Sequence, residues 1–255
     1  MQTDTFTTVV IENDTLAGHL YIPANSEGVP VVIVLGGSGG GLSNVKGELL
    51  AQNGIAVLSL AYFRYKHLPE TLDGIAVEYV INAINYLHNM PVFQTSKIGI
   101  WGASRGSELA FLAATHDSRI KSLVVTTPSK VAWHGATTPV AWTYNNLAVA
   151  SLTFDKASDT AVIDKSSMAL ENPVNVARAQ FRFEKINGPI LLVSAERDQI
   201  WPSFQMARDI EKYLALHQFK HKVIHQSYPT GHTFSQHYWP AISASIVEHF
   251  NRSLR

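Results

Sequence analysis

Runs of β-branched and other apolar residues alternate along the chain with segments of helical period, and this alternation constrains the fold more than any other feature. The predicted strands are residues 31–35, 56–60, 97–101, 123–126, 189–194 and 223–228, preceded by two short alternating segments at 7–11 and 16–22. Several of these runs are apolar on both faces, as strands covered by helices must be. The pattern predicts an α/β fold with a mostly parallel central sheet flanked by helices.

Between the strands, residues 72–88 show the clearest helical period. Val77, Val80 and Ile84 recur at helical spacing, which leaves Glu78 on the opposite face. We expect this helix to serve packing rather than chemistry.

The composition excludes several classes of protein. Of the 255 residues 46% are hydrophobic, which excludes disorder, and 20 Lys+Arg against 20 Asp+Glu without a basic run argue against nucleic-acid binding. The longest apolar stretch, residues 29–35, is far shorter than the roughly 20 residues of a membrane-spanning helix. Zero cysteines exclude disulfides and thiolate chemistry, and the polar first 15 residues do not resemble a secretory signal. We expect one cytoplasmic domain over residues 1–255, without membrane or nucleic-acid partners.

One segment interrupts the alternation. Residues 129–177 contain Trp133, Trp142, Tyr144 and many Ser, Thr and Asn residues, with neither period clearly present. Long irregular segments in compact domains are usually lids or binding loops, so this lid-like insertion is expected to lie over one end of the sheet and shape a substrate pocket. A surface excursion with its own small core is the equal alternative.

The strongest local signal is a G-x-S-x-G motif at residues 102–106, between the predicted strand at 97–101 and an Ala/Leu-rich helical segment. A nucleophile elbow needs this context, because the turn is so sharp that only small residues at Gly102 and Gly106 let strand and helix approach. The motif predicts Ser104 as a nucleophile at a helix N-terminus. A glycine-rich strand-to-helix turn without chemistry is the alternative.

A serine nucleophile needs a base and an acid that orients the base. Asp198 follows the predicted strand at 189–194, and His232 follows the one at 223–228, in the chain order Ser, Asp, His. The carboxyl ends of parallel strands share one edge of the sheet, so these three side chains are expected to meet there. Glu196 is the alternative acid, and the other histidines considered as bases are His217, His221, His225 and His237.

The glycine-rich loop at residues 36–41 directly follows the predicted strand at 31–35. Its bare backbone can bring N–H groups to an oxyanion, so we assign this role to the amide of Ser38 or Gly37 together with that of Arg105. Leu42 and Ser43 follow the glycines, so the Lys of a phosphate-binding loop is absent, and no acidic ribose partner ends the strand at 56–60. No histidine pair forms a convincing metal site. We expect neither a metal nor a cofactor.

Several stretches together resemble the catalytic domain shared by acyl-CoA thioesterases and bile-acid-CoA:amino-acid N-acyltransferase. They are GGSGGGL at 36–42, LLAQNGIAVLSLAYF at 49–63, LPETLD at 68–73, EYVINAINYL at 78–87, GASRG at 102–106, AWTY at 141–144, INGPILLVS at 186–194 and DQIWPS at 198–203. The resemblance implies an α/β-hydrolase fold, with Ser104, Asp198 and His232 as catalytic triad and an acyl thioester as small-molecule substrate. The longer members carry a β-sandwich domain ahead of this one, whereas here the glycine-rich loop begins at residue 36.

The amidating branch of that family uses Cys as nucleophile, whereas this chain has Ser104 and no Cys, so we expect water as acceptor. The expected activity is therefore hydrolysis of acyl-CoA-type thioesters through an acyl-enzyme. The alternatives are a carboxylesterase acting on oxygen esters, an acyltransferase and a catalytically silent binder. Trp133, Trp142, Tyr144 and Trp201 are candidates to line an acyl pocket, although buried aromatic residues are more often plain core. Arg64, Lys66 and Arg105 are candidates to contact a CoA phosphate, although exposure to solvent is the commoner role of such charges.

Overall fold

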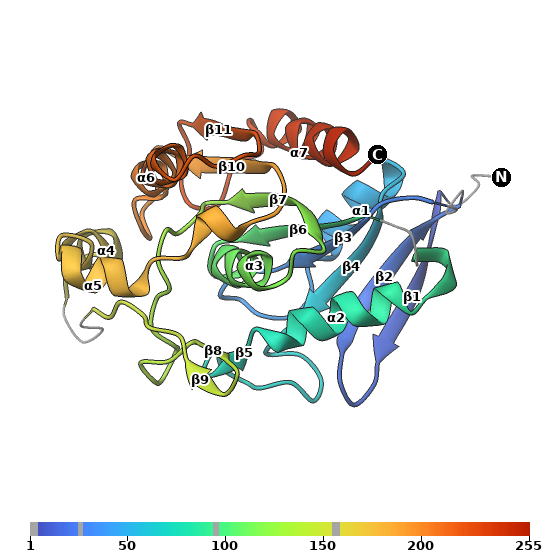
Figure 1. Cartoon of the computed structure of the whole chain (residues 1–255), viewed down its shortest axis with the longest axis horizontal. Helices are drawn as coiled ribbons and strands as arrows, with labels where there is room; N and C mark the ends of the chain where they lie inside the picture. Colours follow the sequence, from blue (N-terminus) through green and yellow to red (C-terminus); the bar gives the residue numbers. More distant parts are fainter. Residues whose placement is uncertain (1–4, 25–27, 94–96, 155–158) are drawn as a thin grey trace.

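The computed structural model describes residues 5–24, 28–93, 97–154 and 159–255. Its centre is an eight-stranded sheet in the order β1-β2-β4-β3-β6-β7-β10-β11 (Figure 1). The first two strands are antiparallel to their neighbours, and all other pairs are parallel. The strands are β1 (Phe6–Glu12), β2 (Ala17–Pro23), β3 (Val31–Leu35), β4 (Ala56–Ala61), β6 (Ile98–Ala103), β7 (Ile120–Thr126), β10 (Ile190–Ala195) and β11 (Val223–Tyr228).

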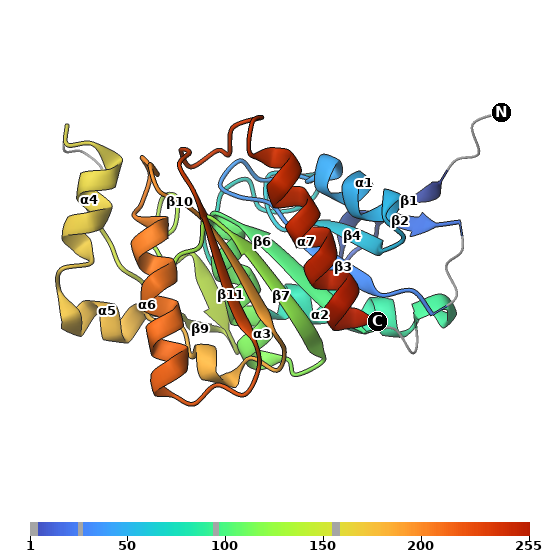
Figure 2. The same ribbon diagram turned by 90° about the horizontal axis from the view of Figure 1, so that it is seen from above.

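Helices cover both faces of this sheet. Because side chains alternate along a strand, Val32 and Val34 of β3 pack in one apolar cluster while Ile33 packs in another. The first cluster includes residues of α1 (Asn44–Gln52) and α7 (Trp239–Leu254). The second includes residues of α2 (Glu78–His88), α3 (Arg105–His116) and α6 (Ser203–Leu216). Figure 2 shows α7 lying diagonally across its face of the sheet.

The fold class predicted from the sequence is confirmed, and the predicted strands lie within a few residues of the observed ones. The bounds of β3 and β11 coincide with the predictions. The predicted helix over residues 72–88 is wrong at its start, because residues 72–77 are not helical. Gly74 adopts a positive φ of 65°, which a right-handed helix cannot accommodate, and Ile75–Ala76 forms the short strand β5. Helix α2 therefore begins only at Glu78.

The lid-like insertion contains its own secondary structure. Strand β5 pairs with β8 (Trp142–Tyr144), which pairs with β9 (Leu147–Ala148), and the helices α4 (Val162–Ala169) and α5 (Pro173–Ala179) follow. Figure 1 shows α4 and α5 at one side of the molecule, next to α6. Val131, Trp133 and Leu152 form a separate apolar cluster with Trp201 and Met206. The segment thus has a small core, and this core includes residues that precede or begin α6.

Two 3₁₀ turns complete the described elements, at Pro91–Phe93 and Phe183–Lys185. Over the described residues, no helix is both long and apolar enough to cross a bilayer.

Candidate active site

Ser104 lies in the sharp turn between β6 and α3, with φ 52° and ψ −122°. Such a backbone is strained for a residue with a side chain, and strained residues of this kind cluster at functional sites. Glycine is required on both sides of the turn. A Cβ at Gly102 would lie 2.2 Å from the Gly106 carbonyl oxygen, and one at Gly106 would lie 2.2 Å from that of Gly36. The close contacts of this turn therefore explain why the motif has glycine at both positions.

The three side chains predicted as a triad meet at the carboxyl end of the sheet. Ser104 Oγ lies 2.8 Å from His232 Nε2, and His232 Nδ1 lies 2.9 Å from both carboxylate oxygens of Asp198. The Asp198 carboxylate is buried, and its Oδ1 also accepts the N–H groups of Ile200 (2.9 Å) and Trp201 (3.3 Å). These bonds fix the carboxylate, which contacts Nδ1 of the imidazole while Nε2 faces the serine hydroxyl.

Gln199 is a supporting residue that the sequence did not single out. Its side-chain Oε1 accepts the backbone N–H of His232 at 3.1 Å. A Cβ on Gly231 would lie 2.7 Å from the same Oε1, so glycine allows Gln199 to reach the histidine loop. The Asp198 loop thus holds His232 by its backbone as well as by its ring.

The alternative acid and bases lie elsewhere. Glu196 is exposed and accepts the hydroxyl of Ser227 at 2.7 Å. His225 bridges Ser194 Oγ (2.7 Å) and Glu211 (2.9 Å), away from Ser104. The remaining histidines contact neighbours within their own segments: His217 contacts Tyr213, His221 contacts Phe219, and His237 contacts Tyr238.

The glycine-rich loop lies against Ser104. A Cβ on Gly37 would stand 3.2 Å from Ser104 Cβ and 3.7 Å from its Oγ. The buried Tyr62 hydroxyl donates to the Gly36 carbonyl oxygen at 2.6 Å, and burial raises the pKa of Tyr62, so this hydroxyl remains a donor. Among the described residues the amides of Gly37, Ser38 and Arg105 have no acceptor within the protein. They are the donors expected for an oxyanion next to Ser104.

A pocket of about 550 Å³ opens over Ser104 and His232. Trp133 and Trp201 both line it, with their rings stacked at a centroid distance of 6.2 Å, and Trp201 packs edge-on against His232 at 5.3 Å. The Trp201 indole N–H donates to the Thr127 carbonyl oxygen at 3.2 Å. The pocket also takes apolar surface from Phe63, Leu72, Phe154, Val162 and Ile200, which the sequence did not suggest.

Two of the four aromatic candidates do not contribute to this pocket. Trp142 is fully buried, and its indole N–H donates to Glu108 Oε2 at 2.8 Å. Tyr144 stacks on His116 with a centroid distance of 3.7 Å, at the opposite end of α3 from Ser104. Neither Trp142 nor Tyr144 lines the pocket over Ser104, and for Trp142 the alternative of a buried core residue matches its position. Both residues belong to β8, which pairs with β5 in the small second sheet.

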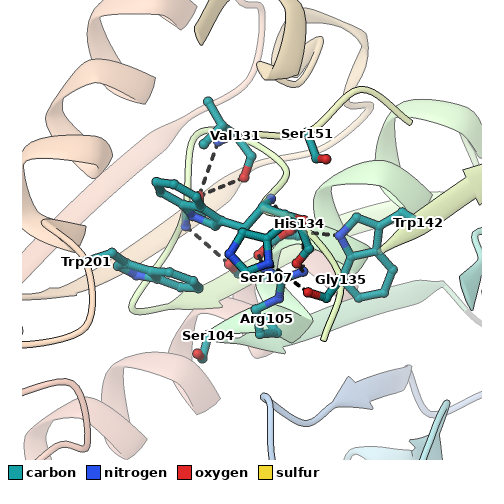
Figure 3. A network of polar contacts seen from close by, with 12 residues as sticks. Ser104, Arg105, Ser107, Val131, His134, Gly135, Trp142, Ser151 and Trp201 are labelled. Carbon is teal, nitrogen blue, oxygen red and sulfur yellow. Dashed lines mark hydrogen bonds and ion pairs between the residues drawn. The ribbon is translucent and has the colours of Figure 1, made fainter. Parts of the chain in front are cut away.

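A buried ion pair that the sequence did not indicate contacts the part of the pocket wall formed by Trp133 and His134. Figure 3 shows Arg105, His134 and Trp142 in the polar network around it. Arg105 Nη1 stands 3.2 Å from Glu108 Oε1, and Arg105 Nη2 donates to the carbonyl oxygens of Trp133 (3.0 Å) and His134 (3.1 Å). Glu108 Oε2 accepts the Trp133 backbone N–H (3.0 Å) as well as the Trp142 indole. Burial raises the pKa of Glu108 to about 7, although Arg105 and the two N–H donors act in the opposite direction. The pair thus joins the backbone of Trp133 and His134 to helix α3, which begins directly after Ser104.

In the described part of the chain, no three His, Cys, Asp or Glu side chains gather in an arrangement that could hold a metal ion.

Known proteins resemble this chain in sequence. The family described as "BAAT / Acyl-CoA thioester hydrolase C terminal" matches residues 75–254. Acyl-coenzyme A thioesterase 2, mitochondrial, of Rattus norvegicus is 32% identical over 242 residues, which are 93% of this chain and 52% of that protein. The chain spans about half the length of the curated relatives it matches.

Solved structures share the fold at lower identity. A dienelactone hydrolase from Anabaena variabilis superposes with a TM-score of 0.62 at 18% identity, covering 98% of this chain and all of that one. Carboxyl esterase 2 from Tuber melanosporum gives a TM-score of 0.63 at 18% identity, covering 100% of this chain and 90% of that one. The resemblance found in the sequence is confirmed at the level of family and fold.

Proposed function

Because the chain belongs to the family of BAAT and acyl-CoA thioester hydrolase C-terminal domains, we propose that it hydrolyses acyl thioesters of the acyl-CoA type through a serine acyl-enzyme. One observation carries the proposal. Ser104 Oγ, His232 and the buried Asp198 form a continuous chain of contacts of 2.8 and 2.9 Å at the floor of an apolar pocket. This is the arrangement that makes a serine hydroxyl nucleophilic.

In the first half of the proposed reaction, Ser104 Oγ attacks the thioester carbonyl carbon while His232 Nε2 takes the hydroxyl proton. Asp198 stabilises the imidazolium that forms and keeps its Nδ1–H oriented. Negative charge on the carbonyl oxygen is held by the Arg105 amide together with that of Ser38 or Gly37. The intermediate collapses when the carbon–sulfur bond breaks and His232 returns the proton to the leaving sulfur, which departs as a thiol.

In the second half, water attacks the acyl-enzyme and gives a proton to His232. Collapse of the second tetrahedral intermediate releases the carboxylic acid and restores the Ser104 hydroxyl with the same proton. The strained turn places Ser104 Oγ at the N-terminal end of α3. The oxyanion therefore forms beside the helix N-terminus, where the partial positive charge of the helix stabilises it.

The test is the initial rate of the purified protein on a chain-length series of acyl-CoA thioesters and matched aryl esters, with Ser104→Ala as control. Turnover of acyl-CoA at a kcat/KM of about 10⁴ M⁻¹s⁻¹ or above, lost in the variant, supports the proposal. Ser104-dependent turnover of esters alone makes the protein a carboxylesterase. Absence of Ser104-dependent turnover of either class refutes the proposal and favours a silent binder. Products formed in the presence of competing amines distinguish hydrolysis from acyl transfer.

We further propose a cytoplasmic location, which rests on the absence of cysteine from the sequence. Fractionation of cells of the source organism tests it, with recovery from an organelle fraction as the opposing result.

A further inference from the structure

Arg64 lies in the loop that follows β4, and this loop packs on the glycine-rich loop of the active site. The Gly41 N–H donates to the Phe63 carbonyl oxygen at 3.0 Å, and the Arg64 N–H donates to that of Pro69 at 2.6 Å. Gly40 has a positive φ of 68°, and a Cβ there would stand only 2.7 Å from Arg64 Cβ. The backbone of Arg64 is therefore fixed against the loop that faces Ser104.

The backbone conformation of Arg64 is strained. Its φ is 49° and that of Lys66 is 53°, in the left-handed region that residues with a side chain seldom adopt. Strain of this kind persists only where the surrounding structure enforces it, and it is concentrated at sites of function. Two such residues in one short loop beside a catalytic pocket suggest that the direction of a side chain matters there.

The charges around the pocket single out Arg64 from the three cations that the sequence suggested. Lys66 pairs with Glu12 at 3.3 Å and does not line the pocket. Arg105 lines it, but its guanidinium is engaged by Glu108 and two carbonyl oxygens. Arg64 also lines the pocket, and it is exposed. Its side chain has no ion-pair or hydrogen-bond partner among the described residues, and no described carboxylate lines the pocket.

We infer that Arg64 binds an anionic group of the substrate and so determines which thioesters the site accepts. This inference rests on the proposed thioester hydrolysis. A guanidinium binds phosphate and carboxylate through paired N–H donors, and an uncompensated positive charge in a pocket attracts anions. The anion has two possible sources: a phosphate of the CoA moiety, or a carboxylate at the far end of the acyl chain.

The experiment compares Arg64→Gln with wild type on three thioesters of equal acyl length. They are an unsubstituted acyl-CoA, the neutral N-acetylcysteamine thioester of the same acid, and an N-acetylcysteamine thioester whose acyl chain ends in a carboxylate. We expect Arg64→Gln to lower kcat/KM about tenfold or more for the substrate whose anion Arg64 binds, mainly through KM. Turnover of the neutral thioester should be unchanged. A loss on acyl-CoA identifies the phosphate, and a loss on the carboxylated thioester identifies the acyl carboxylate.

Lys66→Gln is the matched control, because it removes a neighbouring cation with similar backbone strain that lies outside the pocket. It should leave all three rates unchanged, while Arg64→Lys should restore part of the selectivity because it keeps the charge. The inference is wrong if Arg64→Gln affects all three thioesters equally or none. If wild type hydrolyses none of them, the proposed function fails as well. If Ser104-dependent turnover remains but selectivity does not change, only the role of Arg64 fails.

Discussion

Gly37 offers the sharpest test of whether the glycine-rich loop takes part in the proposed reaction. In Gly37→Ala the added Cβ would stand 3.2 Å from Ser104 Cβ and 3.4 Å from the Ala103 carbonyl oxygen. The contact with Ser104 Cβ is tighter than ordinary van der Waals contact, and the one with the Ala103 oxygen is at its limit, so the loop and Ser104 must separate by a few tenths of an ångström. The hydrogen bond from the Tyr62 hydroxyl to the carbonyl oxygen of the preceding Gly36 opposes this movement.

The expected effect follows from the geometry of the oxyanion donors. Loss of one donor typically costs about 10²–10³ in rate, and catalytic groups must be held within about 0.5 Å of their working position. A shift of a few tenths of an ångström should therefore lower kcat about 10- to 100-fold, with a smaller effect on KM. The crowding costs about 1–3 kcal/mol of stability, which the reduced entropy of the unfolded chain offsets by about 0.4–1 kcal/mol.

Gly39→Ala is the matched control in the same loop. Gly39 also lines the pocket, its φ lies outside the left-handed region, and a Cβ there meets nothing within 4 Å. We expect this variant to keep wild-type kcat and to gain slightly in stability. The assay is steady-state hydrolysis of one thioester by the three proteins, with thermal unfolding followed by circular dichroism. Unchanged kcat in Gly37→Ala, or equal losses in both variants, would refute the assignment of the loop to the oxyanion.

Three further outcomes follow from the structure. Asp198→Asn should lower kcat about 10⁴-fold while the fold remains intact, because an amide no longer fixes the His232 tautomer, and near-normal kcat would remove Asp198 from the triad. Gly106→Ala should fail to yield folded protein, because its Cβ would stand 2.2 Å from the Gly36 carbonyl oxygen; a wild-type melting temperature would contradict the turn described here. Burial raises the pKa of Glu108 from 4.5 to about 7, so the folded protein holds this proton more tightly than the unfolded chain does. The Glu108 contribution to the free energy of unfolding should therefore fall by up to about 3 kcal/mol as pH rises from about 4.5 to above 7. Denaturant titrations should give a lower free energy of unfolding at pH 8 than at pH 5 in wild type, and this difference should be smaller in Glu108→Gln.

The sheet could be predicted because each parallel strand carries its own signal. Strand β3 is five consecutive apolar residues, all fully buried, and the glycines that end it mark its boundary. The same holds for the elbow, where glycines before and after Ser104 are required by contacts of 2.2 Å. The proximity of Asp198 and His232 to Ser104 could be predicted because each follows a parallel strand, and the carboxyl ends of parallel strands share one edge of the sheet.

The start of α2 could not be predicted from the same kind of pattern. Leu72, Ile75 and Val77 continue the helical period, and all three are buried, but for a different reason. Ile75 pairs with Trp142, far along the chain, in a second small sheet. A periodic pattern records that a residue is buried without recording what it contacts, so pairing between distant segments overrides the local preference.

The role of Trp142 was missed for a related reason, and it changes how the site is understood. The sequence made this indole a candidate for the acyl pocket, with a place in the core as the alternative, whereas its N–H donates to the buried Glu108. Glu108 lies one helical turn after Arg105, within a run of residues that otherwise reads as an apolar buried helix, and nothing local reveals its partners. Those partners are the backbone of Trp133 and the indole, both from the lid-like insertion. Arg105, directly after Ser104, thus supplies a backbone amide to the proposed oxyanion site and a side chain that holds Trp133 and His134 in the pocket wall. Movement of that wall is therefore coupled to the start of α3, and substitutions at Glu108 are expected to affect the rate through the geometry at Arg105 without contacting the substrate.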